Sequence, residues 1–242
     1  MTKVKPKVFI TMPCYGDMKV ETCVSILNTY SALAKAGVEC KFKSVRSSLV
    51  THARNLATCA FLHSGYDYML FVDADVEFPA EAVLRMLVPQ KDVVCTPYRV
   101  KTNVGKMDYA VKFKDPDFIK ILPWDLVEIT EGPAGLMLIS RKVFDKLMVD
   151  YPKLQSKFDD EDRAKMNSEV GTETDVAAKY MWNFWDTSFE DGRWKGEDLS
   201  FCNLVTKSGF KIYANLDSWT THHGSYGWRG KFGDSLIKKP IH

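Results

Sequence analysis

Two carboxylates follow a strongly apolar segment of the chain. Asp73 and Asp75 come directly after "YMLFV" (68–72), with one alanine between them. Such a run is typical of a strand buried in a parallel sheet, and carboxylates are costly to desolvate without a partner. Residues two apart on an extended chain project to the same side, and paired oxygen ligands there suit Mn²⁺ or Mg²⁺. The alternative is a strand-end turn that tolerates aspartate.

The same D-x-D pattern occurs twice more in the sequence. Asp115 and Asp117 flank Pro116, a combination typical of a turn. Asp160 and Asp162 belong to "DDED" (159–162), which we interpret as a solvated acidic surface. Only the pair at 73 and 75 follows a buried strand, so only that pair is a candidate metal site.

A second group of carboxylates lies in "RWKGEDLSFCNLVTKSGF" (193–210). Glu197 and Asp198 follow Gly196 and begin an amphipathic helix that Gly209 ends. Asp198 could cap this helix through backbone N–H groups. It could instead be a general base that removes a proton from a hydroxyl nucleophile. The residues alone leave both interpretations open.

The segment "WTTHHGSYGWRGKFG" (219–233) combines adjacent histidines with two basic residues. A neutral imidazole of His222 or His223 could complete the shell of a bound cation, and Arg229 and Lys231 could hold a diphosphate. The alternative is a surface loop in which the histidines are incidental.

The elements that must position these groups alternate regularly in the first half of the chain. Predicted strands at 7–13, 38–45, 68–72 and 92–97 are separated by helices at 19–36 and 48–64 and by a short helix opening at Pro79. This order predicts an α/β fold with an open, mostly parallel sheet and helices on both faces. Ligands bind outside the carboxyl ends of such strands, where Asp73, Asp75 and residues 13–17 would meet.

The second half is predicted to be less regular. It contains extended segments at 100–130, a strand at 135–140, a short helix at 141–148 and long loops at 150–196. The loops include aromatic residues, Trp185 among them, that could form a platform for a sugar acceptor or could simply be packed in a core. These residues are Tyr180, Trp182, Phe184, Trp185, Phe189 and Trp194.

Composition narrows the class of protein. The net charge is +2 over 242 residues, which argues against bulk electrostatic binding of nucleic acid or an anionic membrane. No apolar run approaches the roughly 20 residues of a spanning helix, and "MTKVKPKVFITMP" (1–13) turns polar before a signal-like segment develops. The six cysteines include no CxxC pair. We therefore expect reduced thiols in a cytoplasmic protein.

The ordered motifs resemble those of nucleotide-sugar-dependent glycosyltransferases of the GT-A fold, closest to family 2-like bacterial, phage and large-virus enzymes. The resemblance covers roughly residues 6–227, in the order "PCYG", "ARNLA", "FVDADVEF", "GPAGLMLISRKVF", "KGEDLSFC" and "HHGSY". It implies one glycosyltransferase domain over 1–242, with a nucleotide-sugar-binding half at about 1–100 and an acceptor-binding, catalytic half at about 101–242. The implied reaction moves a sugar from a UDP- or GDP-linked donor to a hydroxyl of a carbohydrate or glycoconjugate acceptor.

The resemblance also implies roles for individual residues. Asp73 would touch the donor ribose or a metal-bound water, while Asp75 and His222 would bind Mn²⁺ or Mg²⁺, with His223 as the alternative ligand. Asp198 would be the base of an inverting enzyme, and Glu197 is the competing carboxylate. The nucleotide pocket would be lined by Pro13, Tyr15 and Arg54, and the donor sugar bordered by Ala134 and Gly135.

The sequence departs from the pattern of this family in two places, and two other functions are also possible. The segment 150–195 matches no acceptor motif, and "GKFGDSLIKKPIH" (230–242) resembles a tail of retaining enzymes. A metal-dependent nucleotidyltransferase or phosphohydrolase also places aspartates at strand ends. A non-catalytic module that binds nucleotide sugars is the third possibility.

Overall fold

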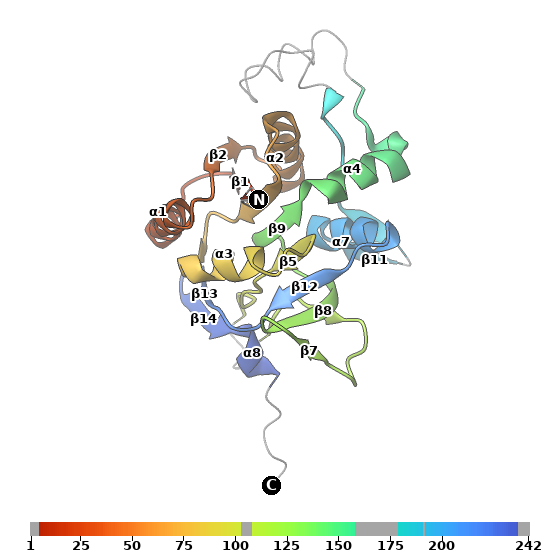
Figure 1. Cartoon of the computed structure of the whole chain (residues 1–242). Helices are drawn as coiled ribbons and strands as arrows, with labels where there is room; N and C mark the ends of the chain where they lie inside the picture. Colours follow the sequence, from red (N-terminus) through yellow and green to blue (C-terminus); the bar gives the residue numbers. More distant parts are fainter. Residues whose placement is uncertain (1–4, 103–107, 158–178, 191, 237–242) are drawn as a thin grey trace.

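The computed structural model of the chain describes residues 5–102, 108–157, 179–190 and 192–236 (Figure 1). Its helices are α1 (Val20–Lys35), α2 (Val50–Ser64), α3 (Ala80–Leu87), α4 (Arg141–Asp150), α7 (Glu197–Lys207) and α8 (Phe232–Ser235), with a 3₁₀ turn at Pro152–Leu154. Its longer strands are β1 (Val8–Cys14), β2 (Cys40–Arg46), β3 (Tyr68–Val72), β8 (Leu126–Glu131), β9 (Leu136–Ser140), β12 (Ile212–Asn215), β13 (Trp219–His223) and β14 (Gly227–Lys231). The short strands are β4 (Val76–Glu77), β5 (Val93–Cys95), β6 (Lys112–Phe113), β7 (Ile121–Leu122), β10 (Ser188–Glu190) and β11 (Arg193–Lys195).

The central sheet has the strand order β2-β1-β3-β9-β5-β12-β8-β6, and β7 pairs with β8. Strands β2, β1, β3, β5 and β12 run in one direction, while β9 lies antiparallel between β3 and β5. All five residues of β9 are buried, which suits an apolar strand in the middle of a covered sheet. The predicted α/β class with a mostly parallel central sheet is confirmed.

Helices cover both faces of this sheet because alternate strand residues point to opposite sides. Met69 and Phe71 of β3 pack in the cluster that includes residues of α2, α4 and α7. Leu70 and Val72 of the same strand pack with α1 and α3. The strand is therefore apolar throughout, and its chain emerges from the core only at Asp73.

The predicted elements of the first half are confirmed to within a few residues. Gly65 ends α2 with φ +72°, a conformation that glycine adopts at low cost. Asp115 accepts backbone hydrogen bonds from Asp117 and Phe118, which confirms the predicted turn. Asp160 and Asp162 lie outside the described residues.

The segment 219–233 is not the surface loop that was the alternative prediction. Its residues form the β13–β14 hairpin, which β4 extends into a three-stranded sheet, and α8 begins at its end (Figure 1). Because β4 immediately follows Asp75, this pairing brings the histidines of β13 beside the strand-end carboxylates.

The helices in the described part of the chain include none that is both long enough and apolar enough to cross a membrane. Of the six cysteines, Cys59, Cys95 and Cys202 are buried and the other three are half-buried, all as free thiols.

Candidate active site

A cleft of about 700 Å³ lies at the carboxyl ends of β1 and β3. It is lined by the turn after β1, the start of α2, the turn after β3 and the start of α7, together with Lys101 and the end of β13. The predicted residues on its lining are Pro13, Tyr15, Arg54, Asp73, Asp75, Glu197, Asp198 and His223. The fold thus brings the candidate carboxylates of both halves of the chain to one cavity.

Arg54 is the centre of a buried charge cluster at this cleft. Its side chain is only 2% exposed, and its guanidinium lies over the rings of Phe71 and Trp185 at 5.1 and 5.5 Å from their centroids. Burial by itself would lower the pKa of Arg54, but the surrounding carboxylates raise it, so the side chain stays cationic. Arg54 lines the cleft, where it also holds the surrounding acidic groups in place, and its contact with a nucleotide stays a prediction.

Three carboxylates share this one cation. Arg54 Nη2 donates to Asp73 Oδ1 at 3.0 Å and lies 3.6 Å from Asp198 Oδ1, and Nε donates to Glu197 Oε1 at 3.3 Å. With all four groups ionised the cluster carries two excess negative charges. One carboxylate protonates more readily as a result.

Asp198 is the carboxylate whose protonation is most affected. Burial raises the pKa of Asp198 to about 7; the Arg54 guanidinium opposes this, and the Glu197 and Asp73 charges add to it. Asp198 Oδ2 accepts the backbone N–H of Ala134 at 3.1 Å, and Oδ1 is buried without a hydrogen-bond partner in the described part of the chain.

The capping interpretation of Asp198 is wrong. Gly196 is the N-cap residue of α7, no side chain caps that helix end, and Asp198 is inside its first turn. The Asp198 carboxylate instead reaches across to the chain before β9. A carboxyl group with a pKa near neutrality in a cleft is suited to general acid–base catalysis.

The two strand-end aspartates diverge instead of sharing one side. Both oxygens of Asp73 have protein partners, since its Oδ2 also accepts a hydrogen bond from the Tyr98 hydroxyl at 3.2 Å. The chain turns directly after it, and Asp75 points toward Lys101 and toward His222, whose Nε2 lies 3.5 Å from Asp75 Oδ1. The two aspartates therefore have different partners, and the part of Asp73 in a cation site stays a prediction.

Asp75 and His222 do fit a divalent cation. Burial alone would raise the pKa of Asp75, but hydrogen bonds from His222 and Lys101 outweigh it and lower the pKa to about 2. His222 Nδ1 lies 2.9 Å from the Arg99 carbonyl oxygen and donates to it, so Nε2 is the ring nitrogen that faces Asp75 and could bind a cation when it carries no proton. No cluster of three or more metal-ligating side chains occurs among the described residues. Further ligands would come from phosphate and water, as Mn²⁺ and Mg²⁺ sites commonly require.

His223, Arg229 and Lys231 have other partners. His223 Nε2 lies 3.1 Å from Glu77 Oε2, so the imidazole faces Glu77 instead of Asp75. The Arg229 guanidinium lies over the ring of Trp219, 4.0 Å from its centroid, and Lys231 pairs with Asp217. Neither basic residue lines the cleft, so the prediction that they hold the diphosphate is wrong.

Ala134 and Gly135, the small residues before β9, were predicted to border the donor sugar, but the structure leaves no room for a sugar beside them. A Cβ on Gly135 would lie 2.2 Å from Asp73 Oδ2 and 2.4 Å from the Tyr98 hydroxyl oxygen, so these polar groups fill the space. Ala134 is fully buried and contributes its N–H to Asp198. Both residues position the carboxylates of the cleft.

We expect Gly135→Ala to destabilise the fold by about 1–3 kcal/mol and to displace the Asp73 carboxylate. The added methyl group meets backbone-anchored polar groups, because Asp73 N–H also donates to the Gly135 carbonyl at 2.8 Å. Thermal unfolding measures the loss. Gly16→Ala is the matched control, since a Cβ there meets nothing within 4 Å; equal effects of the two substitutions would contradict this account.

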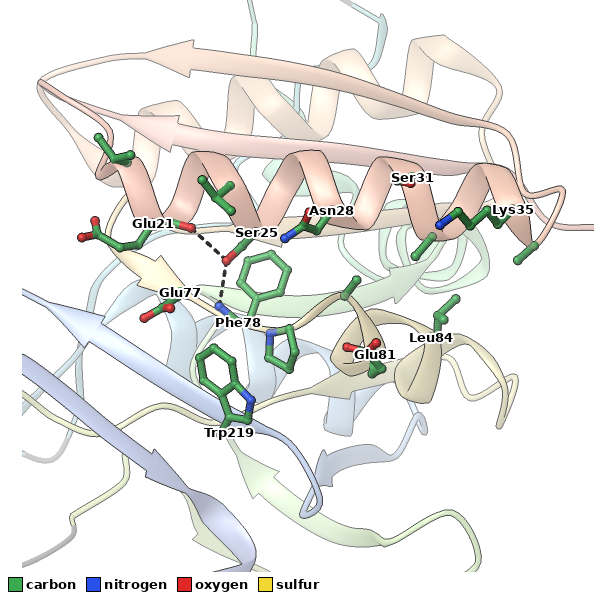
Figure 2. Close-up of a pocket in the computed structure, with 16 residues that line it drawn as sticks. Glu21, Ser25, Asn28, Ser31, Lys35, Glu77, Phe78, Glu81, Leu84 and Trp219 are labelled. Carbon is green, nitrogen blue, oxygen red and sulfur yellow. Dashed lines mark hydrogen bonds between the residues drawn. The ribbon is translucent and has the colours of Figure 1, made fainter.

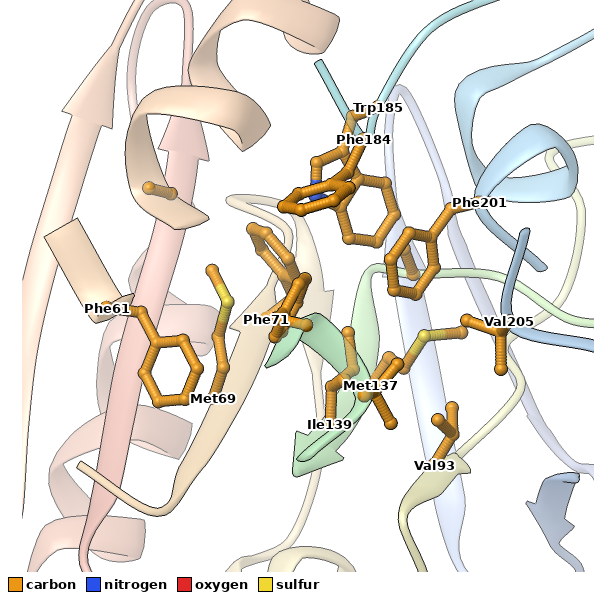
Figure 3. Close-up of a cluster of buried hydrophobic side chains, with 14 of the residues drawn as sticks. Phe61, Met69, Phe71, Val93, Met137, Ile139, Phe184, Trp185, Phe201 and Val205 are labelled. Carbon is orange, nitrogen blue, oxygen red and sulfur yellow. The ribbon is translucent and has the colours of Figure 1, made fainter. Parts of the chain in front are cut away.

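Trp185 is a core residue and not part of an acceptor platform. It is fully buried and stacks on Phe201 at 4.0 Å between centroids (Figure 3). Its indole N–H donates to Thr58 at 3.0 Å. The exposed aromatic residues of this region are Phe189 and Trp194, which pair across the β10–β11 hairpin just before α7.

A second cavity, of about 840 Å³, lies between α1 and the segment from β4 to α3 (Figure 2). Ser25, on the lining of this cavity, donates a hydrogen bond to the Glu21 carbonyl and accepts one from the Phe78 N–H. These bonds, and a further one from Lys19 N–H to the Ala74 carbonyl, connect the turn that carries Asp75 to α1. The Arg54 cluster borders only the smaller cleft, which is therefore the candidate active site.

Lys101, which lines the cleft, and Tyr98, whose hydroxyl donates to Asp73, were not singled out from the sequence. Tyr98 and Lys101 come shortly after β5, in "TPYRVK" (96–101). The usable signal was their place beyond the carboxyl end of a predicted parallel strand, where ligands bind in such sheets.

No protein-family model and no curated protein matches the chain. Among solved structures, A197 from STIV is 20% identical over 90% of this chain and 86% of that one, with a TM-score of 0.49. The catalytic domain of Drosophila beta1,4galactosyltransferase 7, in complex with xylobiose, is 11% identical over 88% of this chain and 66% of that one, with a TM-score of 0.45. A putative glucose-1-phosphate thymidylyltransferase from Bacillus anthracis is 13% identical over 89% of each chain, with a TM-score of 0.41.

Glycosyltransferases and nucleotidyltransferases are thus both among the proteins with similar structures. Because the reported TM-scores lie below 0.5, these likenesses decide neither the family nor the activity of this chain.

Proposed function

We propose that the protein is a divalent-metal-dependent glycosyltransferase of the GT-A type that the sequence motifs resemble. The observation that carries the proposal is the joint placement of two different acidic sites on one cleft. Asp75 with His222 forms one end, and Asp198, held by Ala134 N–H and close to Arg54, forms the other. Cleavage of a sugar–diphosphate bond needs charge stabilisation at the leaving group and a base at the nucleophile.

The chain's own residues divide this work. Asp75 and His222 would hold Mn²⁺ or Mg²⁺, which when bound would neutralise charge on the departing diphosphate. Asp198 takes the proton from the acceptor hydroxyl, and the acceptor for that proton is its Oδ1 atom, which has no hydrogen-bond partner in the described structure and lies 3.6 Å from Arg54 Nη2. Arg54 keeps Asp198 and Asp73 in position without contacting the sugar. Pro13 and Tyr15, which line the cleft, would contact the nucleotide.

The acceptor is proposed to be a carbohydrate or glycoconjugate that meets the exposed rings of Phe189 and Trp194. These side chains are 62% and 75% exposed, their centroids lie 5.4 Å apart, and their hairpin leads directly into Glu197 and Asp198. Aromatic rings in this exposed position suit the apolar face of a sugar.

A nucleotidyltransferase or phosphohydrolase would use the same metal site and is distinguished by its products. The test is incubation with UDP- and GDP-sugars and Mn²⁺, with and without sugar acceptors. A glycosyltransferase releases intact nucleoside diphosphate. Formation of nucleoside monophosphate and sugar 1-phosphate from these donors, or release of pyrophosphate when a nucleoside triphosphate and a sugar 1-phosphate are supplied instead, would overturn the proposal in favour of the other class.

Asp75→Ala is expected to abolish Mn²⁺-dependent binding of UDP or GDP while leaving the fold intact. The side chain is 34% exposed and its partners can be solvated, so stability depends little on it. Calorimetric titration with and without Mn²⁺ measures the effect. Metal-dependent affinity that survives in the variant would exclude Asp75 as the metal ligand.

A further inference from the structure

Lys101 lies where its charge competes with a metal ion. Its ammonium group pairs with Asp75 Oδ2, while His222 faces the other carboxylate oxygen, Oδ1, at 3.5 Å. Lys101 also lines the cleft beside Asp75 and Gly224. One carboxylate therefore has an imidazole on one oxygen and a lysine on the other.

The backbone around Lys101 is fixed from both sides by the β13–β14 hairpin. The Arg99 carbonyl accepts from His222 Nδ1 at 2.9 Å, and the Thr102 carbonyl accepts from Trp228 Nε1 at 2.9 Å. A Cβ on Gly224 would lie 3.4 Å from Lys101 Cδ, so the aliphatic stem passes closely over that glycine. The backbone is held, whereas the ammonium at the end of the stem can change partner.

We propose that Lys101 is an exchangeable counter-ion, which neutralises Asp75 when the cleft is empty and transfers to the donor diphosphate when a divalent cation binds Asp75 and His222. A lysine and a divalent cation repel each other and cannot share one carboxylate at low cost. A displaced ammonium a few ångströms from the metal is well placed for a phosphate oxygen, which binds lysine as a point charge. The second half of this exchange rests on the proposed function, since it assumes a diphosphate ligand.

Removing the charge of Lys101 should change the Mn²⁺ affinity and the nucleotide affinity in opposite directions. Lys101→Met keeps the length of the stem, so Mn²⁺ alone should bind about tenfold more tightly once its competitor is gone. UDP or GDP in saturating Mn²⁺ should bind at least about tenfold more weakly, because a hydrogen bond to a charged group is lost. A residue with a purely structural role would not strengthen metal binding.

The experiment titrates MnCl₂ alone, and then UDP and GDP at saturating Mn²⁺, into wild type, Lys101→Met, Lys101→Arg and Lys231→Met. Lys231–Asp217 is the matched control pair, with side chains 39% and 34% exposed against 32% and 34% for Lys101–Asp75, and it lies outside the cleft lining. Lys231→Met should change neither the Mn²⁺ affinity nor the nucleotide affinity. Lys101→Arg should keep both affinities at about their wild-type values.

Unchanged Mn²⁺ affinity in a folded Lys101→Met protein would overturn the exchange, as would an effect of equal size in Lys231→Met. Lys101→Gln, a smaller polar replacement, provides the same comparison if Met reduces the yield of folded protein. Because the first titration contains no nucleotide, it stands independently of whether sugar transfer is later observed. If Lys101→Met binds Mn²⁺ more tightly but wild type binds neither UDP nor GDP, the competition between Lys101 and the metal stands and the proposed donor is rejected.

Discussion

Asp198→Asn is expected to lower sugar transfer by about 10²–10⁴-fold, the contribution of a positioned general base. The amide keeps the size of the side chain, and its oxygen can still accept the Ala134 N–H that Asp198 Oδ2 accepts at 3.1 Å. Donor binding with Mn²⁺ should persist, because Asp75 and His222 are untouched. Transfer rate, donor affinity and thermal midpoint, measured on one preparation, separate these effects.

The pH dependence of wild type gives the same prediction an independent readout. Burial raises the pKa of Asp198 to about 7, so the basic form needed for catalysis accumulates as pH rises, and transfer should increase up to about pH 7 and then level off. The folded state binds this proton more tightly than the unfolded state, where the group titrates near pH 4. The resulting loss of stability therefore develops as pH rises from about 4 to about 7. Asp198→Asn should show neither the rise in transfer nor this loss of stability as pH increases.

Glu197→Gln is the necessary control, because Glu197 also contacts Arg54, at 3.3 Å, and is the neighbouring carboxylate. It should retain most of the transfer activity. Near-normal transfer by Asp198→Asn, together with a large loss in Glu197→Gln, would reassign the base. Near-normal transfer by both would favour a retaining mechanism.

Trp185→Ala should destabilise the protein by about 3–5 kcal/mol, the cost of truncating a large aromatic side chain in a packed core. The indole is fully buried, stacks on Phe201 at 4.0 Å and meets Phe71 edge-on at 4.9 Å (Figure 3). It also covers the guanidinium of Arg54. Chemical denaturation should therefore show the loss of stability, and donor hydrolysis and transfer should fall together.

Trp194→Ala is the matched control for this substitution. Its ring is 75% exposed, so the same change should alter the free energy of unfolding by no more than about 0.5 kcal/mol. Comparable destabilisation by the two substitutions would show that the core placement of Trp185 is wrong. A loss confined to transfer in Trp194→Ala would instead support the acceptor proposal.

The sequence alone determined the elements whose patterns are local. Apolar runs, helical periods and the glycines that end them located the strands and helices of the first half, because each depends on neighbours a few residues away. The same reasoning located Asp73 and Asp75 at the edge where ligands bind, since the carboxyl ends of parallel strands meet there.

Only the tertiary structure decided what each of these side chains contacts. Arg54 and Glu197 are 143 positions apart, and no local pattern pairs them. Composition could not distinguish the buried Trp185 from the exposed Trp194, because both lie in the same aromatic stretch. Gly135 illustrates the physical reason: its missing side chain accommodates Asp73 and Tyr98, groups brought to it only when β9 inserts between β3 and β5. Local periodicity specifies which face of an element is buried, whereas the partners on that face depend on how distant segments pack.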